Sequence, residues 1–541
     1  MNPRSGRGGA APRVRILRVV AGGRPSEDPE ASGRLLFAAA LAAGALLRLI
    51  LLGRPDLFAA DEGRWAVGAR NVLEGGAQVL APSTTPLGGP AGTPILFPWV
   101  LSGFVRVFGA EEWAVRFPSA VLGLVAAFVV ERIVRRGWGQ PAGHLAGAFV
   151  ALFPPLVAAS RVATVETMLV ALSLAGVIFG LRAFEEDIPW EGAASGAFFG
   201  LGFLAKGYAV GLFLLPLLLA LAARPRIFTL GRTKRSLLFL VLAFVAVGGA
   251  HLLAVFLLRP ETFAFQLATA FGASEAAARA AALPTAFSAD LMSILRPVFW
   301  FLPVTLLGVA FLWRDVGEDE IASGGTGGDR RLAHGLLWGA YALELVIVVA
   351  IAGRYRLSSI PLMPAIATLT GLGATAIVVS ARARRSISTQ RVAAGAIGAL
   401  LVIGGVESAR RIRHDLLTHR TGARELAAQI APAVASLPAR AIAFRAPEPD
   451  AVAFHLFRTG VAWTGTETAV SLEADARGTV RCWAWREADA PPAAPSGEAK
   501  EWLASHARDA TADVDARAGR TTGLAVRVPE PAVPAPAGAR P

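Results

Sequence analysis

The chain has 541 residues, of which 54% are hydrophobic and only 17% are charged, and its formal net charge is +13. A soluble domain is about one quarter charged, so this composition excludes an ordinary soluble protein and favours a membrane protein. The single cysteine, Cys482, excludes an internal disulfide and a multi-cysteine metal site. In a membrane protein the excess of arginine is typical of cytoplasmic loops, so we expect no nucleic acid partner.

The chain contains about eleven runs that are long and apolar enough to predict transmembrane helices. The N-terminal segment before the first run is too long and too basic for a typical cleaved signal peptide, so we predict that the first run is retained as a helix. The predicted spans lie near residues 34–52, 116–134, 142–159, 166–184, 191–205, 207–223, 236–258, 296–313, 333–352, 358–380 and 391–407.

The run at 94–109 is ambiguous, because it is short and contains Pro98 and Arg106. It is either a further span or an interfacial helix. If it lies on the membrane and the N-terminus is cytoplasmic, the strongest basic clusters between spans fall in cytoplasmic loops, as the positive-inside rule favours. The outer side then receives the loop 53–115, the turn 161–166, Lys206, the loop 259–295, residues 354–356 and everything after about residue 408.

These patterns divide the chain into four predicted parts. They are a basic cytoplasmic tail at 1–33, a membrane domain at 34–408, a periplasmic α/β domain at 409–530 and a disordered Pro/Ala-rich tail at 531–541. In the periplasmic part, helix patterns at 422–436 and 450–457 alternate with strand-like runs at 441–446 and 479–485. The predicted fold class is an all-α polytopic membrane protein with a small C-terminal α/β domain.

Asp61 and Glu62 come shortly after the first apolar run and open the segment DEGRWAVGARNVLEGG. Adjacent carboxylates beside a membrane are costly to bury and are often kept for chemistry. From Trp65 onward apolar residues recur at helical spacing, which predicts a helix lying on the membrane. A structural interpretation stays open, with Asp61 as the N-cap and Glu62 in the first turn, where both favour the helix dipole.

Five more residues on the predicted outer side are candidates for binding. Glu166 precedes a span, where it either stabilises a helix N-terminus or holds a metal ion or a sugar hydroxyl. Lys206 interrupts a long apolar run, as a snorkelling side chain or as a partner for phosphate. Arg354 and Arg356 flank Tyr355, and such a pair is either a phosphate-binding fork or an interfacial anchor.

The chain resembles glycosyltransferase family 39 in the order and spacing of several segments after the Asp–Glu pair. They are EEWAVRFPSAVLGL (111–124), VATVETMLVALSL (162–174), GLGFLAKG (200–207) and YRLSSIPLMPAIATL (355–369), and the tail at 423–460 resembles the periplasmic domain of bacterial members. This family includes the bacterial arabinosyl–lipid A transferases and the protein O-mannosyltransferases, which have the GT-C fold. Two features of the lipid A enzymes are missing: an acidic-Lys-Pro-Pro motif, replaced here at 92–95, and a Glu-His pair in the loop at 265–279.

The resemblance implies an inverting transfer of a sugar from a polyprenyl-phosphate carrier to an unidentified envelope acceptor, catalysed in the outer half of a bacterial inner membrane. No cofactor is certain, and a divalent metal bound by Asp61 and Glu166 stays open. Two alternatives are a non-catalytic member that binds the polyprenyl lipid and a membrane transporter or flippase. The predicted catalytic residues are Asp61 and Glu62, and the predicted substrate-binding residues are Glu166, Lys206, Arg354, Tyr355 and Arg356.

Overall fold

The computed structural model describes most of the predicted membrane domain and short pieces of the C-terminal region. The described ranges are 29–55, 57, 62–75, 77–80, 82, 95–186, 188–222, 231–260, 262–264, 296–322, 331–344, 360–384, 386–418, 427–428, 454–455, 483–486, 507–509 and 524–529.

A described helix overlaps each of the eleven predicted spans. Six of the helical segments are long and apolar enough to cross a membrane, and the bent pair α7–α8 would be a seventh. The other four predicted spans coincide with helices that are shorter or less apolar. The helices are α2 (Pro29–Leu49), α6 (Glu112–Trp138), α7 (Gln140–Leu152), α8 (Pro154–Ser160), α9 (Val165–Glu185), α10 (Pro189–Lys206), α11 (Gly211–Ala222), α12 (Gly231–Phe244), α13 (Ala250–Leu258), α17 (Leu302–Ala322), a helix at 331–344, α19 (Met363–Ala383) and α20 (Ile387–Thr418).

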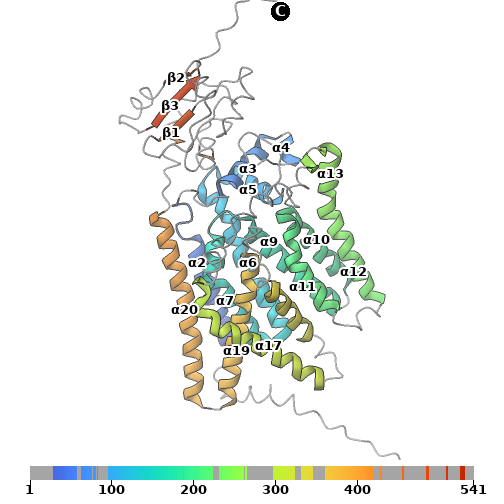
Figure 1. Cartoon of the computed structure of the whole chain (residues 1–541). Coiled ribbons are helices and arrows are strands. Elements are labelled where there is room, and N and C mark those ends of the chain that lie inside the picture. The colour runs from blue at the N-terminus through green and yellow to red at the C-terminus, as the bar shows by residue number, and fades with distance from the viewer. Residues whose placement is uncertain are drawn as a thin grey trace, which may run out of the picture.

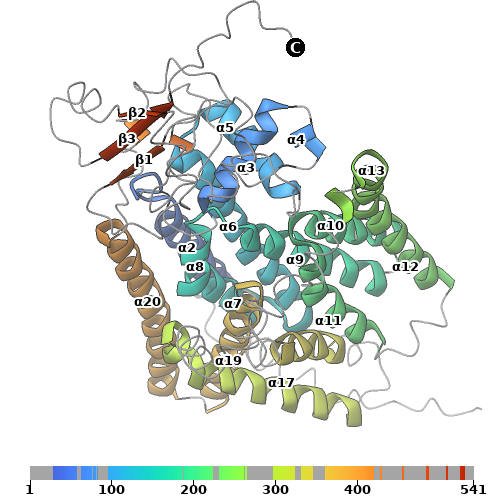
Figure 2. The same cartoon turned by 45° about the horizontal axis from the view of Figure 1, so that its top comes forward.

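Three short helices gather at one end of the bundle (Figures 1 and 2). They are α3 (Glu62–Glu74), α4 (Ala77–Leu80) and α5 (Leu96–Phe108). α5 has 13 residues, so it is about 20 Å long, against about 30 Å for the hydrocarbon core of a bilayer. This length favours the interfacial interpretation of the run at 94–109.

The predicted single span at 142–159 is wrong in one respect, because the structure breaks it at Phe153. α7 and α8 meet there at 56°, and Phe153 has extended backbone angles. Pro154 and Pro155 follow it and have no N–H to donate to the preceding turn. The bend therefore follows from two adjacent prolines that the hydropathy profile does not register.

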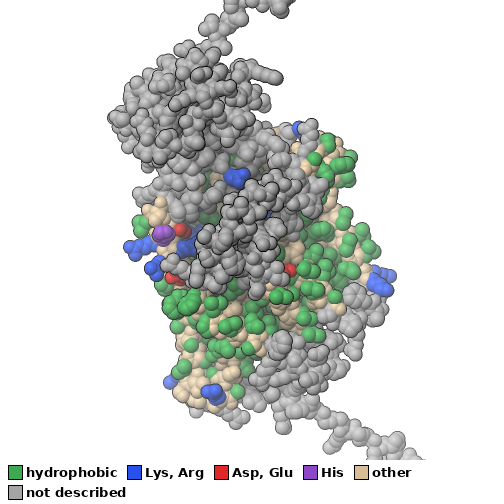
Figure 3. Space-filling view, in the orientation of Figure 1, with side chains coloured by type: hydrophobic (Ala, Val, Ile, Leu, Met, Phe, Trp, Pro, Cys, Tyr) green, Lys and Arg blue, Asp and Glu red, His purple; other side chains and the backbone are tan. Residues whose placement is uncertain are grey.

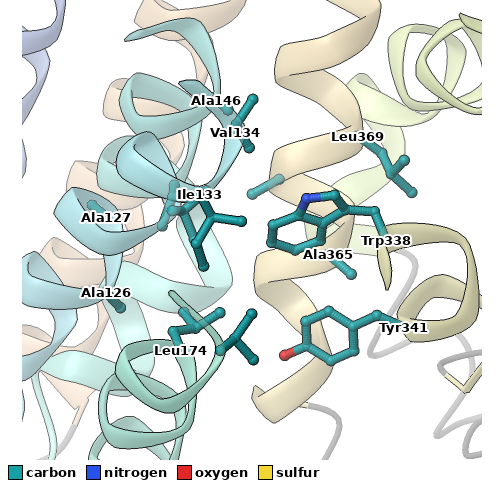
Figure 4. Close-up of a cluster of buried hydrophobic side chains, with 14 of the residues drawn as sticks. Ala126, Ala127, Ile133, Val134, Ala146, Leu174, Trp338, Tyr341, Ala365 and Leu369 are labelled. Atoms are coloured by element: carbon teal, nitrogen blue, oxygen red, sulfur yellow. The ribbon is translucent and has the colours of Figure 1, made fainter. Parts of the chain in front are cut away.

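A buried cluster of apolar side chains joins the bundle (Figure 4). Trp338 and Tyr341, from the helix at 331–344, pack among side chains of α6, α9 and α19 and are at most 3% exposed. Elsewhere on the outside of the bundle, hydrophobic side chains dominate the described surface and Lys and Arg lie toward its borders (Figure 3). A broad apolar surface of this kind is suited to lipid and not to water.

Beyond the bundle, the described part of the C-terminal region forms a three-stranded antiparallel sheet of order β1-β3-β2. Its strands are β1 (Trp483–Arg486), β2 (Ala507–Asp509) and β3 (Leu524–Pro529). β1 overlaps the predicted strand at 479–485, whereas the predicted strand at 441–446 lies outside the described residues. The sheet lies beyond the end of the bundle that bears α3–α5 (Figure 1). The α/β character of the whole region stays a prediction.

Candidate functional site

Glu62 begins α3 and is completely buried against α6. Its two carboxylate oxygens accept hydrogen bonds from Nε and Nη2 of Arg116, at 2.6 and 2.7 Å. Arg116 is only 1% exposed, and its Nη1 also donates to the carbonyls of Leu52 and Pro55, at 3.0 and 2.7 Å. A buried charge pair needs this degree of hydrogen bonding to offset its desolvation. Glu62 therefore fixes the start of α3 onto α6.

The turn between α8 and α9 is tied to the same pair. The amide of Ala163 donates to Oε1 of Glu62 at 2.9 Å. The next amide, of Thr164, donates to Oγ of Ser119 in α6 at 3.3 Å. Thr164 is also the N-cap of α9, where its side chain accepts from the amide of Glu166. The position of the first turn of α9 is thus set by both α3 and α6.

Glu166 and Lys206 are in direct contact, although they lie 40 residues apart in the sequence. The Lys206 ammonium donates to one oxygen of Glu166, and the Thr164 hydroxyl donates to the other. The side chain of Lys206 is 30% exposed and that of Glu166 is 16% exposed, so this pair, unlike Glu62–Arg116, is accessible. α10 ends at Lys206 because Gly207 has a positive φ of 56°.

The structure brings three of the predicted site residues into one connected set. Glu62 contacts the turn that leads to Glu166, and Glu166 contacts Lys206. The other predicted residues lie outside the described residues; they are Asp61, Arg354, Tyr355 and Arg356. Sequence reasoning missed Arg116, which stands within a segment quoted for the family resemblance but has no local signal, because its partner is 54 residues away.

The sequence leaves open a metal ion bound by Asp61 and Glu166. Within the described ranges, no group of three or more His, Cys, Asp or Glu side chains is arranged to hold one. Both oxygens of Glu166 already accept from Lys206 and Thr164. This arrangement fits a carboxylate that orients a cationic side chain.

Comparison with solved structures defines the class of protein. ArnT from Cupriavidus metallidurans bound to undecaprenyl phosphate superposes with a TM-score of 0.61 at 16% identity, over 93% of this chain and 98% of that chain. The same protein in the apo state also gives 0.61. With its apolar helices, the protein is therefore a multi-pass membrane protein that has the GT-C fold of ArnT.

Sequence comparison finds similar proteins over part of the chain. Residues 92–251 match the family model described as dolichyl-phosphate-mannose-protein mannosyltransferase. YycA of Bacillus subtilis strain 168, which carries the name of a mannosyltransferase, is 34% identical over 109 residues, which are 20% of this chain and 16% of YycA. The undecaprenyl phosphate-α-4-amino-4-deoxy-L-arabinose arabinosyl transferase 2 of Pseudomonas fluorescens is 28% identical over 218 residues, 39% of this chain and 35% of that protein.

These matches confirm the resemblance predicted from the sequence: the chain is similar to GT-C glycosyltransferases and shares their fold. The matched region spans about a third or less of the length of either curated relative. The range of the family model, residues 92–251, includes α6 to α10, and so the Glu166–Lys206 pair and Arg116, the partner of Glu62.

Proposed function

We propose that this protein transfers a sugar from a polyprenyl-phosphate carrier to an acceptor in the cell envelope. The observation that carries the proposal is the accessible Glu166–Lys206 pair, held beside α3 by the Glu62–Arg116 pair. The fold it shares with a transferase solved with undecaprenyl phosphate supports the same class of donor.

Lys206 has the chemistry that the leaving group needs. When the bond from the sugar to phosphate breaks, negative charge develops on the lipid phosphate, and a fixed cation nearby stabilises it. The ammonium has three N–H donors, of which Glu166 accepts from one. The partial exposure of Lys206 lets a phosphate oxygen reach the ammonium. In this proposal Arg354, Tyr355 and Arg356 complete the binding of the donor.

The reaction proposed is a single displacement. The acceptor oxygen forms a bond to the anomeric carbon of the sugar while the bond from that carbon to the phosphate oxygen breaks. The acceptor proton passes to the carboxylate of Asp61, and the bond electrons leave with the lipid phosphate toward Lys206. Attack opposite the leaving group inverts the anomeric centre.

The charge distribution supports an orientation for the proposed site. Basic residues at the ends of three helices lie opposite the Lys206 end of the bundle; they are Arg135, Arg136, Lys234, Arg235, Arg382 and Arg384. The positive-inside rule assigns that end to the cytoplasm. We therefore propose that the chain lies in a bacterial inner membrane, with the 1–33 tail cytoplasmic and both the site and the 409–530 region periplasmic.

A lipid-binding measurement tests recognition of the donor. The full-length protein, purified in detergent, is titrated with undecaprenyl phosphate or undecaprenol, and the complexes are counted by native mass spectrometry. We expect wild type to prefer the phosphorylated lipid and Lys206→Met to lose roughly tenfold or more of that preference, as for a hydrogen bond to a charged group. Lys234→Met is the matched control, because Lys234 is exposed at the opposite end. Equal binding of both lipids to wild type would contradict the proposal.

Catalysis is tested in cells. Deletion of the gene should remove a glycosylated envelope component detected by mass spectrometry, and wild type should restore it where Asp61→Asn does not. Full restoration by Asp61→Asn would exclude Asp61 as the base. A component that persists in the deletion strain would favour a non-catalytic member. In vesicles, a flippase would move the lipid-linked sugar without cleaving it, whereas a transferase would release undecaprenyl phosphate.

A further inference from the structure

The bend between α7 and α8 leaves backbone carbonyls without helical partners. In a continuous helix the carbonyls of Val150 and Ala151 would accept from the amides of residues 154 and 155, but both of those are proline. A buried carbonyl without a donor is unfavourable, above all within a membrane. The bend therefore needs a donor from elsewhere in the bundle.

Arg48, near the end of α2, supplies that donor for Ala151. Its Nη1 donates to the carbonyl of Ala151 at 2.6 Å and to that of Gly44 at 3.1 Å, and its side chain is completely buried. The close approach depends on glycine, since a Cβ at position 44 would lie 2.7 Å from the Ala151 oxygen. A Cβ at Gly123 of α6 would lie 2.9 Å from Nε of Arg48.

Arg161, directly after α8, makes the reciprocal contact with α2. Its Nη1 donates to the carbonyls of Leu47, Arg48 and Ile50, at 2.6, 3.2 and 2.8 Å. These are carbonyls at the C-terminus of α2, where helix geometry provides no amide and a cation is favourable. Burial, together with the charge of Arg116, lowers the pKa of Arg161 to about 10, so it stays protonated at neutral pH.

We propose that Arg48 and Arg161 are positioning residues for the donor site. Together they hold the bend between α7 and α8 against the C-terminal end of α2. Arg161 also begins the turn that places Glu166 beside Lys206. The second half of this turn is held by the amides of Ala163 and Thr164, which donate to Glu62 and Ser119. This inference rests on the proposed function for its effect on the lipid, but its effect on the turn is independent of that function.

Hydrogen exchange measured by mass spectrometry tests the positioning directly. Arg161→Met should raise exchange of the amides at 162–166, and Arg48→Gln should raise it at the α7–α8 junction and in the same turn. Arg410→Met, at an exposed arginine of α20, is the matched control and should change neither. Unchanged exchange in the turn of both positioning variants would overturn the inference, whatever the lipid does.

Affinity measurements with undecaprenyl phosphate distinguish a role of Arg161 in positioning the site from a role in general stability. Arg161→Met should lower affinity for this lipid roughly 3- to 30-fold and leave undecaprenol binding unchanged, which also shows that the variant is folded. Arg161→Lys should restore part of the affinity because it keeps a cation at the carbonyls. In the Lys206→Met background, Arg161→Met should have little further effect.

Two results would assign Arg161 a merely structural role. One is an equal loss of affinity for both lipids in Arg161→Met. The other is a loss of affinity for undecaprenyl phosphate that is just as large in the Lys206→Met background. Failure of the proposed function gives a different result, in which wild type itself shows no preference for the phosphorylated lipid. In that case the exchange measurement still decides whether the two arginines hold the turn.

Discussion

The carboxylate of Glu62 and the guanidinium of Arg116 form two hydrogen bonds, of 2.6 and 2.7 Å, in a place where neither side chain is more than 1% exposed. The pair joins α3 to α6, and through Ala163 it also holds the turn before α9. The sequence predicted Glu62 as a catalytic residue beside Asp61. We propose instead that Glu62 anchors the start of α3, and that Asp61, the preceding residue, is the catalytic one.

Removal of one member of this pair should destabilise the protein strongly. Arg116→Met leaves the Glu62 carboxylate buried without its counter-charge, and such changes lower the free energy of unfolding by about 3–5 kcal/mol. We expect a clear fall in the melting temperature of the purified protein in detergent. The double variant Glu62→Met/Arg116→Met should recover part of the loss, because no uncompensated charge remains. A double variant at least as unstable as the sum of the singles would contradict this account.

Thr164→Val should weaken the start of α9 and the orientation of Glu166 together. The hydroxyl accepts from the Glu166 amide and donates to the Glu166 carboxylate, and loss of an N-cap lowers stability by about 1 kcal/mol. Thr164→Ser keeps the hydroxyl and is the matched control. Measurements of melting temperature and of affinity for undecaprenyl phosphate should show losses for Val and near wild-type values for Ser. Equal behaviour of the two variants would show that the hydroxyl is not needed.

Close packing of α17 on α19 should make Gly308 intolerant of a side chain. A Cβ at this position would clash with the backbone carbonyl of Leu369, and backbone cannot yield as a flexible side chain can. Gly308→Ala should therefore lower the melting temperature. Gly395→Ala in α20 is the control, because its Cβ would meet nothing within 4 Å, and there alanine should be neutral or stabilising by about 0.5–1 kcal/mol. Similar melting temperatures for the two variants would refute the packing argument.

Reporter fusions test the proposed orientation. Fusions after residues 137 and 230 should both report the cytoplasm, since both positions adjoin basic clusters at the end of the bundle opposite Lys206. The readout is a pair of reporters that are active on opposite sides of the membrane. A periplasmic signal at both positions would invert the topology and place the Glu166–Lys206 pair on the cytoplasmic side.

The sequence alone determined the membrane class, the resemblance to a family and the positions of the helices. Hydropathy is a local property, so α2, α6 and α9 lie where apolar runs predict them. The order of the quoted segments was enough to indicate the GT-C glycosyltransferases. The prediction that the candidates share one side of the membrane also needed only charge counts, because the positive-inside rule acts on loops and not on tertiary contacts.

Only the tertiary structure decided what the candidate side chains touch. Glu62 pairs with Arg116 and Glu166 pairs with Lys206 through helix packing that no local pattern encodes. The same is true of Arg48. In the sequence it is one charge in an apolar run, and only the structure shows that it donates a hydrogen bond to the carbonyl of Ala151. Such contacts join residues 40 to 103 positions apart. They form because buried charges and unpaired carbonyls must find partners within the bundle, and the fold determines which partners are in reach.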